Sequence, residues 1–115
     1  MPSPTNRRPA SPAPSGGPSS TGVAACEAAL RRSERQLVAA WGEHRAASQA
    51  AFEHDDQPRA NRLRQIGANI TFMASQIEQA KAGLHSRREL TTHLETLTRV
   101  YDSLSDLRRS MSGDI

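Results

Sequence analysis

The residues best suited to hold a metal ion in this chain are one cysteine and four histidines: Cys26, His44, His54, His85 and His93. Two side chains on one helix share an ion when they lie four residues apart, and a zinc finger takes four Cys or His ligands. No two of these histidines have that spacing, and a lone cysteine cannot complete a finger. We therefore expect no metal and no other cofactor, with the histidines at the surface or in turns.

Groups suited to catalysis are equally sparse. A nucleophilic thiol needs a neighbouring base or a helix terminus. Cys26 lies among alanines instead, so we expect it to be buried and reduced. The sequence has no Glu-x-x-His motif of the kind that di-metal bundles use. Gly16 and Gly17 have no strand before them and no lysine after them, unlike a phosphate-binding loop. The sequence therefore predicts a protein that is not an enzyme.

The composition allows one small domain at most. The chain has 115 residues, of which 36% are hydrophobic and 3% aromatic, and only 23 are large apolar residues. That number is low for a self-sufficient globular core. No apolar run approaches the ~20 residues that a membrane-spanning helix requires. We expect no membrane insertion and, because the first 25 residues lack a secretory signal, a cytoplasmic location.

The formal net charge of +3 raises the question of nucleic-acid binding. Residues 22–57 carry −2, residues 58–85 carry +3, and residues 86–115 are neutral. Mixed basic and acidic side chains are typical of a solvated helix surface. The pattern argues against nucleic acid as a partner.

Residues 1–21 hold six of the seven prolines, together with serine, threonine and glycine. Apart from proline, the run 9–18 has no apolar side chain larger than that of alanine. Such a segment cannot bury enough surface to offset the entropy of ordering. It predicts a disordered tail ahead of a helical domain at 22–115.

Strong helix formers dominate residues 23–55, which predicts a first helix there. Leu30, Leu37 and Trp41 fall on one helical face, and Phe52 is expected to continue that face. The second half of this apolar face consists mostly of alanines. A neighbouring backbone could therefore approach closely, but little apolar area would be buried there.

Pro58 disfavours a continuing helix, and Asp55 or Asp56 can cap the next one. A tight turn and a second helix over about 58–82 are therefore expected. That helix has two apolar columns at seven-residue spacing, typical of a coiled-coil seam. The columns are Leu63, Ile70, Ile77 and Leu84, and Ile66, Met73 and Ala80. Phe72 lies off both columns, so it is either exposed or in contact with a third helix.

A third helix is expected over about 87–111. Gly83 weakens a helix, and the spacing of Ser86 and Glu89 is that of a capping box, so a break between the helices is predicted. The alternative is one helix from about 59 to 111, whose heptads would need a three-residue stammer. The columns of the third helix are Leu90, Leu97, Leu104 and Met111, with Leu94 and Tyr101, and with Val100 and Leu107.

The sequence thus predicts an all-α fold: a three-helix antiparallel bundle or helical hairpin with coiled-coil seams, plus the disordered N-terminal tail. Because the seams are long and narrow, we expect a second chain to help cover them. The predicted interface residues are Leu30, Leu37, Trp41, Leu63, Ile66, Ile70, Met73, Ile77, Leu84, Leu90, Leu94, Leu97, Tyr101, Leu104 and Met111.

The predicted function is that of a non-catalytic coiled-coil subunit or adaptor of a larger protein assembly. Its partner would be a protein with helical segments or a second copy of the chain. The first alternative is a small helical chaperone that holds a protein client. A nucleic-acid-binding helical protein is the second alternative.

Overall fold

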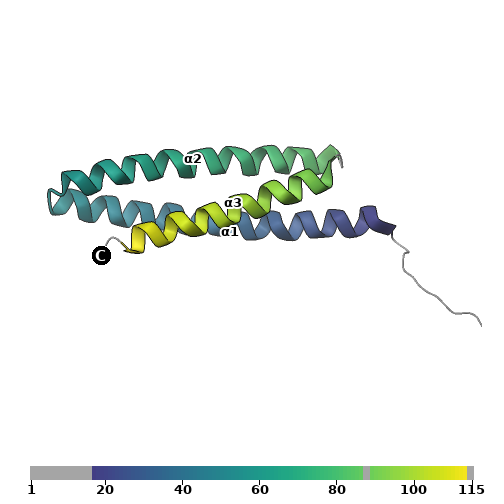
Figure 1. Cartoon of the computed structure of the whole chain (residues 1–115), viewed down its shortest axis with the longest axis horizontal. Helices are drawn as coiled ribbons and strands as arrows, with labels where there is room; N and C mark the ends of the chain where they lie inside the picture. The colour runs from purple at the N-terminus through teal and green to yellow at the C-terminus, as the bar shows by residue number, and fades with distance from the viewer. Residues whose placement is uncertain (1–16, 87–88, 114–115) are drawn as a thin grey trace, which may run out of the picture.

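The computed structural model describes residues 17–86 and 89–113, and within these ranges it contains three α-helices and no strand. They are α1 (Gly17–Glu53), α2 (Gln57–Ser86) and α3 (Leu90–Gly113). Each helix packs against both of the others. The chain reverses direction after α1 and again after α2, so α1 and α3 are parallel to each other and antiparallel to α2 in a long, narrow bundle (Figure 1). The predicted three-helix antiparallel bundle is confirmed.

The helix α1 begins earlier than the sequence predicts. Its first residue is Gly17 rather than one near 23, so it includes the last part of the segment expected to be a disordered tail. Pro18 does not oppose this start, because the first turn of a helix needs no N–H from proline and accepts its fixed φ. The disorder predicted for residues 1–16 lies outside the described residues.

The turn between α1 and α2 follows the sequence closely. The backbone N–H groups of Asp55 and Asp56 donate to the carbonyls of Phe52 and Ala51, at 3.2 and 2.8 Å, which closes α1 with a Schellman motif. Asp55 occupies the left-handed position of that motif with a φ of 52°. The Asp56 side chain then caps α2 by accepting from the N–H of Arg59 at 3.2 Å. The predicted cap is confirmed.

The break between α2 and α3 lies later than predicted, because α2 ends at Ser86 rather than near 82 and α3 begins at Leu90 rather than near 87. The helix α2 continues through Gly83 to Ser86, so Ser86 is inside a helix and the expected capping box is wrong. Instead, the carbonyl of Glu89 accepts the first bond of α3 from the N–H of His93 at 3.0 Å. Gly83 does not end its helix, and its missing side chain makes room for the imidazole of His93. Glu89, with a φ of 52°, rules out the single long helix.

The core joins large side chains from α2 and α3 to small ones from α1. Ile70 and Leu97 are fully buried, and so are Cys26, Ser33 and Ala40 of α1. Small residues let the α1 backbone approach its neighbours, so the three helices close the seams within one chain. Several seam residues stay partly exposed, so the expectation that a second chain helps to cover them stays a prediction.

Candidate protein-binding surface

Two hydrogen bonds, one buried and one partly buried, set the register of α1 against α3. The Cys26 thiol donates to the carbonyl of Leu90 at 3.2 Å, and the Ser33 hydroxyl donates to the carbonyl of Leu97 at 3.1 Å. Both pairs are 64 residues apart, as parallel helices require. Burial raises the pKa of the Cys26 thiol, which keeps it protonated. The thiol is buried as predicted, and it acts as a hydrogen-bond donor between helices.

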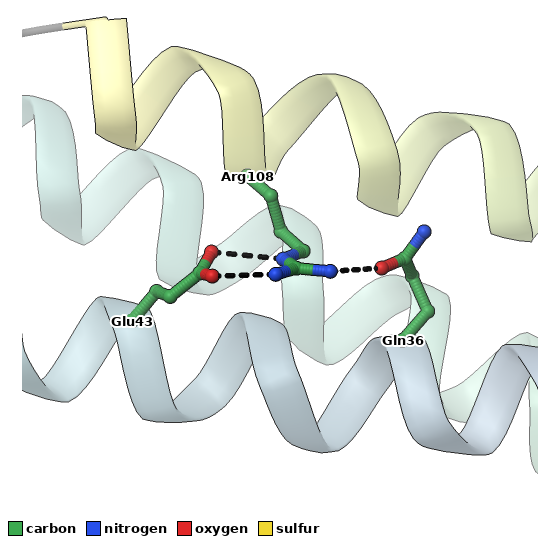
Figure 2. A network of polar contacts seen from close by, with 3 residues as sticks. All are labelled: Gln36, Glu43 and Arg108. Atoms are coloured by element: carbon green, nitrogen blue, oxygen red, sulfur yellow. Dashed lines mark hydrogen bonds and ion pairs between the residues drawn. The ribbon is translucent and has the colours of Figure 1, made fainter.

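Arg108 joins α3 to two successive positions on the face of α1 (Figure 2). Its Nε and Nη2 donate to the two carboxylate oxygens of Glu43 at 2.9 and 2.6 Å, and its Nη1 donates to Oε1 of Gln36 at 2.5 Å. The hydrogen bond from Arg108 lowers the pKa of Glu43, and the same bond raises that of Arg108. Bidentate geometry fixes the orientation of both side chains. The contact therefore holds α1 in place against α3.

Two histidines pack between helices, contrary to the expectation of surface positions. His44 Nε2 donates to the carbonyl of Leu63 on α2 at 2.7 Å, and its ring meets that of Trp41 edge-on at 5.6 Å. A Cβ at Gly67 would lie 2.9 Å from that nitrogen, so glycine permits the contact. His93 occupies the corresponding space over Gly83.

His54 fits the expectation of a turn position, where it is exposed. The side chain of His85 lies outside the described part of the chain.

Most of the predicted interface residues form the chain's own core. The buried members are Leu63, Ile66, Ile70, Ile77, Leu97, Leu104 and Met111. Those packed against them and partly buried are Leu30, Leu37, Trp41, Met73 and Leu94, while Leu84 and Leu90 are half-buried. Tyr101 is 38% exposed. Whether any of them also contacts a partner stays a prediction.

The exposed apolar side chains of α1 lie on the opposite side of that helix from its core contacts. Val38 is 72% exposed and Phe52 is 81% exposed. The expectation that Phe52 continues the buried face is wrong, because Ala51 takes the inward position and the next residue points about 100° away. Arg31 and Arg45 are also exposed, and together these four residues form a column at seven-residue spacing, which we call the outer column.

The exposed charges around the outer column are mostly positive. Within residues 28–52 the two acids are engaged by other helices: Glu34 pairs with Lys81 at 3.8 Å, and Glu43 pairs with Arg108. The four arginines of this stretch are exposed, and none has an ion pair with the described residues. They are Arg31, Arg32, Arg35 and Arg45. The middle of the outer side of α1 is therefore positive, and the exposed acids of residues 22–57 lie toward its two ends, at Glu27, Glu53, Asp55 and Asp56.

Two shallow hollows flank the outer column. One of about 520 Å³ is lined by Arg31, Glu34, Arg35, Val38 and Ala39. The other, of about 430 Å³, is lined by Trp41, His44, Arg45, Ser48 and Gln49. Both are lined only by α1 residues, so a segment lying along this helix could place side chains in both.

The outer surface of α1 cannot be predicted from the sequence pattern alone. The seven-residue spacing of the outer column was present in the sequence, but the column alternates arginine with apolar residues and so gave no apolar seam. The burial of small residues such as Ala40 and Ala51 in the structure distinguishes the inner side of α1 from the outer one.

Within residues 17–86 and 89–113, no group of three or more His, Cys, Asp or Glu residues could hold a metal ion. No helix in these ranges is both long and apolar enough to cross a membrane. No protein-family model, curated protein or solved structure matches the chain.

Proposed function

We propose that the protein is a non-catalytic helical subunit or adaptor that binds a helical segment of a partner protein along the outer column of α1. The observation that carries this proposal is the exposure of Val38 and Phe52 on a helix whose other side completes the core. Their burial against a partner would remove apolar surface from water, at about 25 cal/mol per Å². The fold itself gains nothing from leaving them exposed.

The bundle supports such a role because it holds α1 rigidly along much of its length. Arg108 anchors the helix to α3, and His44 anchors it to α2. A binding helix that is ordered before the partner arrives loses less conformational entropy on docking. The proposal retains the cytoplasmic location expected from the sequence.

The test begins with a partner identified by proximity labelling from the full-length chain. We then compare Val38→Asp/Phe52→Asp with the matched control Thr91→Asp/Thr98→Asp, which adds two acids to exposed positions of α3. The proposal predicts that the first variant keeps its helicity and loses at least tenfold in partner recovery, while the control retains the partner. Equal recovery with both variants, or equal loss, contradicts it.

A chaperone that holds an unfolded client is the second candidate, favoured by Phe72. This side chain is 56% exposed on α2, away from the outer column, so apolar groups are displayed on more than one helix. A chaperone would suppress aggregation of a heat-unfolded client protein, and Phe72→Ser would weaken that suppression. The subunit proposal predicts no suppression at equimolar concentrations.

A further inference from the structure

We infer that the segment docking on the outer column is an acidic amphipathic helix; this inference rests on the proposed function. The outer column alternates charge and apolar character in the order Arg31, Val38, Arg45, Phe52. A complementary segment would alternate an acidic residue with an apolar one at the same seven-residue interval. Such a column stays in register only with another helix that winds around α1.

Charge complementarity identifies the acidic character of the partner. Four exposed arginines lie within residues 28–52 of α1 with no ion pair to the described residues. They outnumber the exposed acids of α1, Glu27 and Glu53, which lie just outside this stretch, and Glu34 beside them pairs with Lys81. Glutamates on a partner helix would pair with these arginines, whereas lysines in the same places would be repelled. The preference is therefore for a negative partner.

The narrow shape of the surface favours a helix over a membrane. A helix lying on a bilayer presents a broad apolar face with basic residues at its edges. Here the column has one large apolar side chain every fourteen residues, with arginine between them. The hollows beside Val38 and Arg45 provide space for individual side chains of an adjacent helix.

The experiment measures binding of two synthetic helical peptides to the full chain by fluorescence anisotropy. Both peptides have three heptads and the same leucines, but one has glutamate and the other lysine at the positions opposite the arginines. We expect the acidic peptide to bind at least tenfold more tightly, with an affinity that falls as salt rises. NMR shifts should cluster at Val38 and Phe52.

Charge reversal provides the decisive comparison. The Arg31→Glu/Arg45→Glu variant should prefer the basic peptide, whereas Arg99→Glu, an exposed arginine on α3, should leave the acidic preference unchanged. Circular dichroism melts establish that each variant folds. Equal binding of the two peptides, or an acidic preference that survives the reversal, overturns the inference.

Two further arms separate this inference from other anionic partners and from the proposed function. The first arm measures binding to vesicles of phosphatidylcholine with 30% phosphatidylserine and to a single-stranded RNA. If either binds through Arg31 and Arg45 more tightly than the acidic peptide does, the inference is overturned. If the labelled partner still depends on Val38 and Phe52 while neither peptide shows a preference, the inference fails and the proposed function stands.

Discussion

Arg108 donates two hydrogen bonds to the carboxylate of Glu43, at 2.9 and 2.6 Å, across the parallel α1–α3 contact. A third bond from the same guanidinium reaches Gln36, which is 7% exposed. One side chain of α3 thus satisfies two polar groups of α1 that lie seven residues apart. Removing it would leave a nearly buried amide and a carboxylate without this donor.

Arg108→Leu should therefore lower the free energy of unfolding. We expect a loss of about 1 kcal/mol, because both charged groups are more than a third exposed and water screens their attraction. Arg109→Leu is the matched control, since Arg109 is exposed and its hydrogen bonds to the described residues are those to Ser105 and Asp106 of its own helix. Urea titrations that show equal losses for the two variants would contradict the role of Arg108.

The Glu43 contact also predicts a dependence of stability on acid. Because the hydrogen bond from Arg108 lowers the pKa of Glu43 in the folded state, the unfolded chain takes up the proton first as the pH falls. The contact contributes its full stability above the unfolded pKa of about 4.3 and loses it progressively below that pH. The stability difference between the wild type and Glu43→Gln should shrink across this range.

Glu95→Gln, at an exposed position of α3, controls for the loss of one carboxylate. Thermal melts at pH 7, 5, 4 and 3 measure both differences. A Glu43→Gln difference that stays constant from pH 7 to 3 would contradict the assignment.

Glycine substitutions should separate helix propensity from close packing. A Cβ at Gly42 meets nothing within 4 Å, so Gly42→Ala should stabilise the protein by about 0.5–1 kcal/mol. Gly83→Ala should lack this gain or destabilise, because the new methyl group would overlap the imidazole of His93. In the background of His93→Ala, Gly83→Ala should recover the gain. A Gly83→Ala effect that is the same in both backgrounds would refute the packing.

Charges placed in the core should prevent folding, whereas a charge on the outer column should not. Ile70 and Leu97 are fully buried, so Ile70→Asp or Leu97→Asp places a carboxylate where it has no partner. Val38→Asp, at a position 72% exposed, should keep helicity and melting temperature near those of the wild type. Circular dichroism measures all three. Unchanged helicity in the core variants would refute the core assignment.

The large columns of the core could be predicted from the sequence because they repeat at the helical period. Leu63, Ile70 and Ile77 recur every seven residues and are all buried. The core residues of α1 were harder to predict. Ala29 and Ala40 are buried, but in the sequence they resemble any surface alanine. An alanine in a closely packed position is no more hydrophobic than an alanine at the surface, so the sequence does not reveal which of them are buried.

The α2–α3 break and the outer surface depend on contacts between distant residues, which the sequence does not reveal. Gly83 predicts a helix end, yet His93 fills its open space and the helix continues. The acids of α1 cancel its arginines in a count by segment, although Lys81 and Arg108 engage Glu34 and Glu43 in space. The sign of a helix surface therefore depends on which charges are already paired.

The proposed function requires that a partner helix docks on the outer column of α1. Its most direct test is a photo-crosslinking amino acid placed at Phe52 in the full chain, compared with one at Thr98 on α3, in cells. Mass spectrometry of the adducts locates the crosslinked peptide. We predict adducts at position 52 that map to one helical, acidic segment of a partner and none at position 98. No adduct at position 52, or the same adducts at both positions, would contradict the account.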